Sequence, residues 1–545
     1  FKKLIDLAKK VEGSARHAST HAAAVIIADK PLNNYTPVQR ESRGGKMVTQ
    51  YDMYALDLNV QDDAIGLLKM DFLGLRNLTI LGRAIDYVKK HHDEKVDLSE
   101  ISLDEPKVFE LLSGGHTTGV FQLESAGMRR VARKLQPNRF SDITAMVALY
   151  RPGPMELIDD FIAGKKDPST IKYPHKVLKP VLEETYGIPV YQEQVLQIAN
   201  VFAGYSLGEA DILRRAIGKK KKSILDKEKK RFVQGAAKKG YDEQTAVTIW
   251  GFIEKFAGYG FNKAHSASYA MIAYQTAYMK AKYPVAYMAA LLSVESNSHS
   301  ANKDEKVAMA IEECRRMNIK VLPPDINRSE DIFAIEAHPD SLNKMAIRFG
   351  FTGIKNVGEA AIDSILEARE ADGDFKSVTD FVSRVDSRRA NKKVIECLVR
   401  TGAFDEFGKR AAIMEGLEDI RNVAIERQKQ LESGQSGLFD TVQSEAQIED
   451  RDKLPNVPEM TQNQMLNAEK ELLGIYLTDH PLAKTLESIP YRTDTTIGNL
   501  DMSQHQGKIR LAGMITSIRQ VVTKRSGKPM AFASLEDQTG SIDLV

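Results

Sequence analysis

The feature that most constrains the fold is a helical pattern that extends, with few interruptions, from about residue 79 to about residue 320. Apolar residues recur there at spacings of three and four, as on one face of an amphipathic helix. Two consecutive prolines, Pro323 and Pro324, end the pattern, because proline cannot continue a helix. With 545 residues the chain is longer than one hydrophobic core normally holds, so we predict a multidomain, mainly α fold with α+β parts.

Composition and charge narrow the class of protein. The two cysteines, Cys314 and Cys397, are too few for a disulfide framework, so we expect a reducing, cytoplasmic environment. No apolar run approaches the roughly 20 residues that a membrane helix needs, so we expect no membrane association. The net charge of +2 does not by itself indicate nucleic-acid binding. The chain starts without a methionine and stops in an apolar strand pattern, which suggests that both ends are cut.

A short strand is predicted around residues 66–74, and it carries two candidate catalytic groups. Lys69 and Asp71 are two residues apart, so both side chains point to one face of the strand. A carboxylate there can hold a divalent metal ion, and the lysine can contact a phosphate. A surface ion pair is the simpler interpretation, and one carboxylate does not make a two-metal site.

Basic residues are concentrated between residues 214 and 231. The set is Arg214, Arg215, Lys219, Lys220, Lys221, Lys222, Lys227, Lys229, Lys230 and Arg231. Such a density attracts the phosphates of a nucleoside triphosphate or of a nucleic-acid backbone. A solvated helix face is the alternative. Arg214 and Arg215 lie inside an amphipathic pattern that Gly218 is expected to end, which favours the phosphate interpretation.

A loop at residues 256–269 combines glycines and aromatic residues with Asn262, Lys263 and His265, and it opens a helix. Aromatic rings, a cation and exposed amides at a helix start together suit a bound nucleotide. A buried aromatic loop is the competing interpretation.

Residues 351–360 fit a helix-hairpin-helix pattern, with Gly353, Lys355, Asn356 and Gly358 at the turn. Glycines allow a tight turn whose backbone amides contact a DNA phosphate without reading the bases. A weaker second copy is predicted at residues 401–408, and an ordinary helix–turn–helix connection remains the alternative.

A polar linker follows the helices that end near residue 430, and strands beyond about residue 505 indicate a small, unfinished β-barrel. Gln435, Leu438 and Phe439 form a short apolar anchor in the linker, of a kind that binds a partner's pocket. A chance apolar pair is the alternative.

Taken together, these segments resemble the alpha subunit of bacterial DNA polymerase III, the DnaE type, over nearly the whole chain. The stretches that carry the resemblance are Lys69-Met70-Asp71-Phe72-Leu73-Gly74, Gly119-Val120-Phe121-Gln122-Leu123-Glu124, Tyr150-Arg151-Pro152-Gly153-Pro154, Val190-Tyr191-Gln192-Glu193-Gln194, Leu213-Arg214-Arg215-Ala216 and Tyr259-Gly260-Phe261-Asn262-Lys263-Ala264-His265.

The resemblance implies five parts. They are the thumb end and last part of a polymerase-β-like palm (1–78), helical fingers (79–330), a helix-hairpin-helix region (331–425), a clamp-binding segment and linker (426–500) and an incomplete OB domain (501–545). The amino-terminal phosphoesterase-like domain and the palm strand with two paired aspartates have no counterpart here.

The resemblance also implies roles for single residues. Asp71 corresponds to the third metal-binding aspartate, with Lys69 as a phosphate contact beside it. Arg214 and Arg215 correspond to residues near the incoming triphosphate, Lys219 lies in the same phosphate-binding stretch, and Asn262, Lys263 and His265 lie in the fingers loop. Gln435, Leu438 and Phe439 correspond to the peptide that binds the sliding clamp.

We therefore expect a part of a DNA-directed DNA polymerase that uses two Mg²⁺ ions, binds primer–template DNA, deoxynucleoside triphosphate and a sliding clamp, and meets other replisome subunits. With one of three aspartates, the chain alone is expected to be inactive. A non-catalytic DNA-binding scaffold is the alternative.

Overall fold

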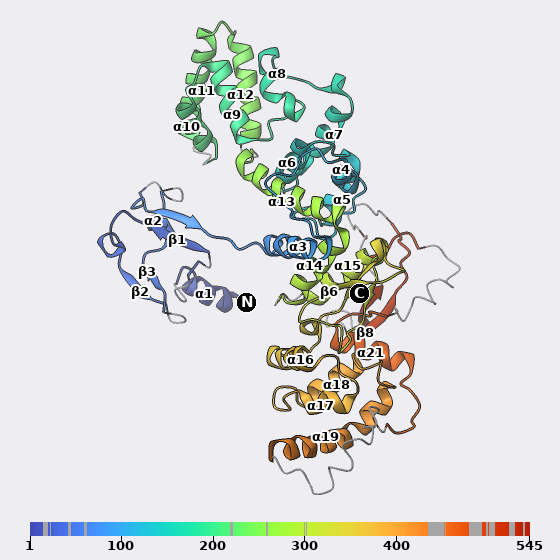
Figure 1. Ribbon diagram of the computed structural model, residues 1–545. Helices are drawn as coiled ribbons and strands as arrows, with labels where there is room; N and C mark the ends of the chain where they lie inside the picture. The colour runs from blue at the N-terminus through green and yellow to red at the C-terminus, as the bar shows by residue number, and fades with distance from the viewer. Residues whose placement is uncertain are drawn as a thin grey trace. The chain divides into compact units, whose positions relative to one another are not determined.

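The structure is a computed structural model (Figure 1). It describes residues 1–14, 20–21, 23–41, 45–58, 61, 63–218, 222–257, 260–298, 300, 302–433, 452, 454–478, 493–497, 500, 507–522, 529–537 and 540–545. Two compact units, Phe1–Arg76 and Asn77–Val545, are described separately. Within the described residues, no helix combines the length and the apolar character that crossing a membrane requires.

The first unit contains two small antiparallel sheets. Its elements are α1 (Lys2–Val11), β1 (Ala24–Ile27), β2 (Val38–Arg40), β3 (Met47–Thr49), α2 (Met53–Leu56) and β4 (Leu68–Asp71). Strand β1 pairs with β4, so that Ala24 lies opposite Asp71 and Ile26 opposite Lys69. Strand β2 pairs with β3. The strand that the sequence predicts around residues 66–74 is thus present as β4.

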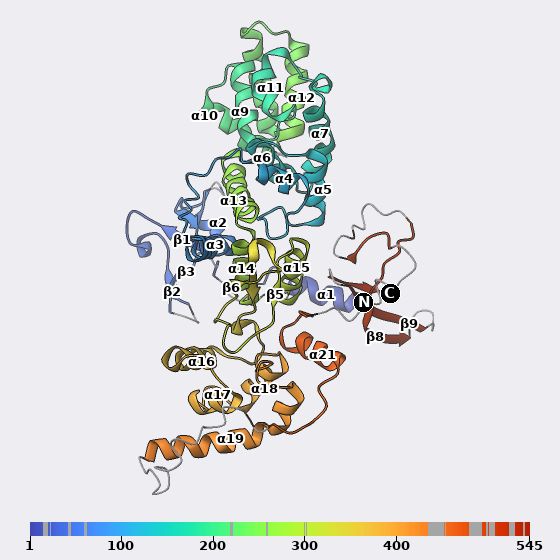
Figure 2. The same cartoon turned by 45° about the vertical axis from the view of Figure 1, so that its right-hand side comes forward.

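The second unit begins with the helical stretch that the sequence predicts. Its first helices are α3 (Arg76–His92), α4 (Pro106–Ser113), α5 (Ala126–Leu135), α6 (Phe140–Leu149), α7 (Ile158–Lys166) and α8 (Lys179–Leu182). Helices α9 (Gln192–Ala203), α10 (Leu207–Gly218), α11 (Lys222–Lys238) and α12 (Glu243–Ala257) follow. These last four lie together in one bundle (Figure 2). They enclose their own core around Phe202, Phe232 and Trp250. Helix α10 is described as far as Gly218, the residue at which the sequence predicts its end, and residues 219–221 lie outside the described part.

Three long helices connect this bundle to the rest of the unit. They are α13 (Lys263–Lys282), α14 (Pro284–Ser296) and α15 (Lys303–Arg316). Helix α13 carries buried residues along its whole length, from Ser266 to Lys280, and packs on α6 and α4. A second core runs from α3 and α14 into the part of the chain that follows the proline pair.

After the prolines, a three-stranded sheet forms from β5 (Val321–Leu322), β6 (Ala334–Ala337) and β7 (Met345–Arg348) in the order β5-β7-β6. Helices α16 (Glu359–Asp372), α17 (Val378–Arg384), α18 (Lys392–Arg400), α19 (Arg410–Ser433) and α21 (Gln462–Leu472) come next. Helix α19 continues into the predicted polar linker, and α21 lies at the C-terminal end of that linker. Residues 434–451 are outside the described part.

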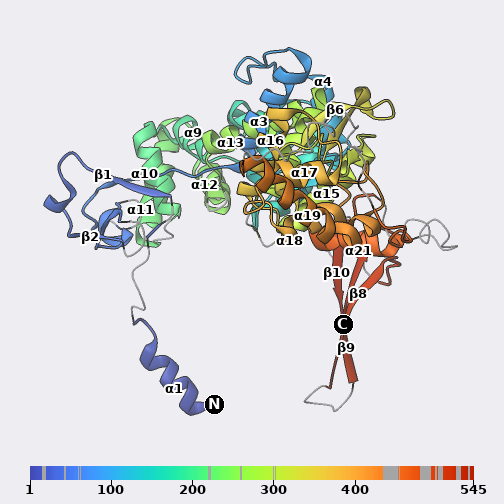
Figure 3. The same cartoon turned by 60° about the horizontal axis from the view of Figure 1, so that its bottom comes forward.

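The described C-terminal residues form an antiparallel sheet of β8 (Met514–Val522), β9 (Pro529–Asp537) and β10 (Gly540–Leu544), in the order β10-β9-β8 (Figure 3). Strand β9 is therefore central, with β8 and β10 at the edges. These three strands form an open sheet within the described residues. The fold is mainly helical with small sheets, as the sequence predicts.

Candidate functional site

Lys69 and Asp71 lie on one face of β4, as their spacing predicts. The Lys69 Nζ lies 2.7 Å from Asp71 Oδ1 and 3.0 Å from Oδ2. The hydrogen bond from Lys69, with a smaller contribution from the charge of His21, holds the pKa of Asp71 below its ordinary value. Among the residues that the structure describes, no three His, Cys, Asp or Glu side chains are grouped as metal ligands. The observed arrangement is thus the ion pair of the simpler interpretation, with one carboxylate.

In the second unit, two segments about 70 residues apart meet at the start of α9 and of α13. Gln192 N donates a hydrogen bond to Phe261 O at 2.9 Å, and Phe261 N donates to Val190 O at 3.0 Å. Tyr191 and Phe261 therefore form a short parallel bridge. A Cβ on Gly260 would lie 3.2–3.3 Å from atoms of Gln192, so this close approach favours glycine. The bridge brings the loop before α13 against α9.

Arg214, on α10, contacts the start of α9 beside this bridge. Its Nη1 donates to Gln192 Oε1 at 3.1 Å, and its Nε donates to Asp211 Oδ1 at 2.9 Å. Gln192 Nε2 in turn donates to Gly260 O at 3.2 Å. The side chain of Arg214 remains 31% exposed, so part of its charge faces solvent. The side chain of Arg215 and the whole of Lys219 lie outside the described part of the chain.

Lys263 and its neighbours begin α13 at the bridge. The Lys263 Nζ pairs with Glu184 at 2.6 Å and lies 5.3 Å from the centre of the Tyr191 ring. Asn262 is the N-cap, and its Oδ1 accepts from His265 N at 2.8 Å. The ring of His265 lies 5.6 Å from Phe261 and 4.2 Å from Tyr269, measured between ring centres.

The sequence predicts exposed backbone amides at the start of α13, and this prediction is wrong for two of these amides. The Glu193 carboxylate accepts from Lys263 N at 3.0–3.1 Å, and Asn262 accepts from His265 N. A carboxylate is stabilised there because the N-terminal end of a helix carries partial positive charge. In this state the cations Arg214 and Lys263, rather than these amides, are the groups that can meet a phosphate.

Sequence reasoning missed Arg151 as a site residue. Its guanidinium lies 4.6 Å from the centre of the Phe261 ring, within cation–π range. Burial lowers the pKa of Arg151. The turn at residues 150–154 carries part of the family resemblance, but nothing in its spacing indicates that it contacts the loop before α13.

The first hairpin has the tight geometry that the glycine pattern predicts. A Cβ on Gly353 would lie 2.4 Å from the Phe349 ring, and Asn356 has a left-handed φ of 69°. Gly358 is the N-cap of α16. Lys355 is held within the chain, because its Nζ pairs with Asp304 at 3.0 Å and its N donates to Leu472 O at 2.8 Å.

Another turn between two helices lies at residues 385–391, between α17 and α18, and we call it the second hairpin; the sequence prediction did not include it. Its Asp386 N donates to Ser364 Oγ of α16 at 3.1 Å, while Asn356 Nδ2 of the first hairpin contacts Cys397 Sγ of α18 at 3.8 Å. Each hairpin therefore contacts the helix that follows the other. Arg388 and Arg389 are exposed on it. The predicted copy at residues 401–408 is a run of turns between α18 and α19.

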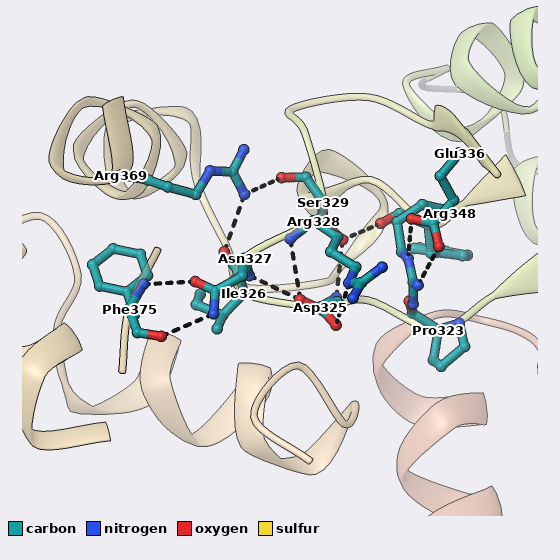
Figure 4. Close-up of polar contacts among 11 residues, drawn as sticks. Pro323, Asp325, Ile326, Asn327, Arg328, Ser329, Glu336, Arg348, Arg369 and Phe375 are labelled. Carbon is teal, nitrogen blue, oxygen red and sulfur yellow. Dashed lines mark hydrogen bonds and ion pairs between the residues drawn. The ribbon is translucent and has the colours of Figure 1, made fainter. Parts of the chain in front are cut away.

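The loop after the two prolines fastens this region to the sheet (Figure 4). Asn327 bonds both backbone groups of Phe375, with distances of 2.9 and 2.8 Å. Arg369 Nη1 of α16 donates to Ile326 O at 3.1 Å and Ser329 O at 2.8 Å. The loop thus holds α16 and the segment before α17 in fixed positions.

Gln435, Leu438 and Phe439 lie outside the described residues.

Three parts of the sequence match models of known protein families. Residues 1–74 match the bacterial DNA polymerase III alpha NTPase domain, residues 77–240 match the bacterial DNA polymerase III alpha subunit finger domain, and residues 318–414 match a helix-hairpin-helix motif.

Three relatives are named DNA polymerase III subunit alpha. The protein from Thermus aquaticus is 45% identical over 554 residues, that from Aquifex aeolicus 41% over 547, and that from Escherichia coli strain K12 39% over 557. Each alignment covers 100% of this chain but only 43%, 44% and 46% of the relative, respectively. The chain belongs to the family of bacterial DNA polymerase III alpha subunits and spans less than half the length of these relatives.

Proposed function

We propose that this chain is part of the catalytic subunit of a replicative DNA-directed DNA polymerase, which adds deoxynucleotides to a primer 3′ end by phosphoryl transfer. The observation that carries the proposal is the meeting of Arg214, Lys263 and Arg151 around the Tyr191–Phe261 bridge. Phosphoryl transfer depends mainly on positioning and on neutralising phosphate charge, and cations on rigid helices supply both.

In this proposal the incoming triphosphate contacts Arg214 and Lys263, with Arg215, Lys219, Asn262 and His265 as further contacts. Arg214 and Lys263 are paired with Asp211 and Glu184 within the chain. A triphosphate carries more charge than one carboxylate, so it can compete for both cations. The aromatic rings of Phe261 and Tyr269 flank His265 and offer a surface for stacking.

Asp71 would supply one carboxylate ligand for Mg²⁺, with Lys69 as a phosphate contact. The described residues do not gather three His, Cys, Asp or Glu side chains around Asp71, so they do not fit a two-metal site by themselves. We therefore assign no catalytic step to the metal in this chain. In the full-length polymerase, other segments would complete the site.

The remaining parts would hold DNA and partners. Lys355, Asn356 and Gly358 in the first hairpin would face the DNA backbone, while the buried Gly353 would shape the turn, and the second hairpin adds Arg388 and Arg389. The end of a palm (1–78), fingers (79–330), an OB domain (501–545) and a clamp-binding segment that includes Gln435, Leu438 and Phe439 complete the proposed organisation. Other replisome subunits would bind the full-length protein.

A substitution in the full-length polymerase tests the catalytic proposal against the scaffold alternative. Asp71→Asn should abolish primer extension and leave primer–template affinity unchanged, because it removes one carboxylate charge on β4. Asp63→Asn, the same change at an exposed position of the same unit, is the matched control. Extension at an unchanged rate by Asp71→Asn would refute the role of Asp71, and absence of extension by the unsubstituted protein would favour a scaffold.

A further inference from the structure

Gln192 connects two groups that the sequence places far apart. Its side-chain amide accepts a hydrogen bond from Arg214 Nη1 at 3.1 Å and donates one to Gly260 O at 3.2 Å. An amide is suited to this position because it offers an acceptor for the guanidinium and a donor for the carbonyl. A carboxylate lacks the donor, and an aliphatic side chain lacks both.

The backbone holds the Gln192 side chain in position. Gln192 is the first residue of α9, and its N donates to Phe261 O at 2.9 Å. The small size of Gly260 allows the two backbones to come together. The position of the amide is therefore fixed by the same bridge that places the start of α13.

Arg214 also has a partner on its own helix. On one side its guanidinium contacts Asp211, three residues earlier on the same helix, at 2.8–2.9 Å. That contact alone would hold the arginine against its own helix. The bond to Gln192 directs Arg214 toward Gly260 and the start of α13, where Lys263 lies.

We infer that Gln192 is a positioning residue, which holds the Arg214 guanidinium at the loop before α13 so that Arg214 and the loop can bind one triphosphate together. The inference rests on the proposed function, in which Arg214 contacts the incoming nucleotide. Gln192 itself need not touch the nucleotide. Its effect passes through Arg214.

The test uses single-nucleotide incorporation by the full-length polymerase on a primer–template, with KM for the deoxynucleoside triphosphate, kcat and DNA affinity measured separately. Gln192→Leu keeps the size of the side chain and removes both hydrogen bonds. Losing a hydrogen bond to a charged group should raise KM about tenfold, while DNA affinity remains unchanged. Gln197→Leu is the matched control, because Gln197 is an exposed glutamine on the same helix.

A double-mutant cycle with Arg214→Ala separates positioning from a general effect on the fold. If Gln192 acts through Arg214, Gln192→Leu should raise KM in the unsubstituted protein and have no further effect in the Arg214→Ala background. An equal effect in both backgrounds would overturn the inference, because the change would then act through the loop or through folding. Thermal unfolding of each variant provides the accompanying check of stability.

The outcomes distinguish the inference from the proposed function. If Arg214→Ala raises KM and Gln192→Leu does not, the positioning role of Gln192 is wrong and the role of Arg214 stands. If Arg214→Ala leaves KM unchanged, the role of Arg214 is wrong and the inference fails with it.

Discussion

A buried charge network at the end of α13 gives a sharp prediction about stability. Lys280 is completely buried, and its Nζ donates to His116 O at 2.8 Å, Thr118 O at 2.7 Å and Glu313 Oε1 at 2.6 Å. Arg316 donates to both oxygens of Glu313 at 2.8 Å. The network joins α13, α15 and the loop at residues 116–118. We predict that Glu313→Gln breaks it.

The expected loss of stability follows from the burial of Lys280. Glu313→Gln leaves the ammonium of Lys280 in the interior with neutral acceptors alone and no counter-charge. Removing one partner of a buried ion pair costs about 3–5 kcal/mol, because the other charge stays desolvated. Glu312→Gln is the control, since Glu312 is only partly buried and pairs with Arg315 at 3.4 Å, a contact worth about 0–1 kcal/mol.

The contribution of Glu313 to the stability of the folded chain depends on pH in a definite direction. Burial alone would raise the pKa of Glu313, but the bonds from Arg316 and Lys280 outweigh it and lower the pKa to about 2. A carboxylate with a depressed pKa stabilises the folded state above its ordinary value of 4.5, and that stability is lost as the pH falls toward 2. Glu313→Gln should therefore reduce the loss of stability between pH 4.5 and 2.

The assay is urea unfolding of the 545-residue chain at pH 7, with hydrogen exchange in α13 and α15 to locate the loss. Adding Lys280→Met to Glu313→Gln should recover part of the stability, because it removes the unpaired charge. An effect of Glu313→Gln no larger than that of Glu312→Gln would refute the reasoning.

Three further predictions concern other parts of the chain. Gly260→Ala should destabilise the Tyr191–Phe261 bridge by about 1–3 kcal/mol in the same urea unfolding assay, and it should raise KM for the nucleotide. Gly251→Ala is the control and should not lower stability, because Gly251 lies on the open side of α12. Asp452→Asn should cost about 1 kcal/mol and increase hydrogen exchange in α17, because Asp452 accepts from two backbone amides at the start of that helix. Replacing Leu438 and Phe439 by Ala should lower processivity with a clamp present but leave single-nucleotide incorporation unchanged, and unchanged processivity would remove the clamp assignment.

Local patterns predicted the elements well. Periodicity predicted the helices between residues 79 and 320, and the spacing of Lys69 and Asp71 correctly predicted that both lie on one face. Glycine at residues 353 and 358 predicted the first hairpin, because its steric demand is a property of a few neighbouring residues. Such signals depend on interactions over short distances along the chain.

Contacts between distant segments could not be predicted in the same way. The hydrogen bonds that Gln192 makes to Arg214 and to Gly260 depend on the packing of α9, α10 and the loop before α13, which no spacing rule encodes. The capping of α13 by Glu193, about 70 residues earlier, is another example. The second hairpin was missed because Asp386 and Arg388 carry no glycine pattern, although they lie between two short helices.

The central claim is that the segments around the Tyr191–Phe261 bridge bind the triphosphate. Photolabelling tests it most directly. The full-length polymerase, bound to primer–template, would be irradiated with a deoxynucleoside triphosphate that carries an aryl azide on its γ-phosphate. The account predicts label in peptides from residues 184–215 and 260–269, and loss of that label with excess unlabelled nucleotide. Competable label that lies only elsewhere in the protein would contradict it.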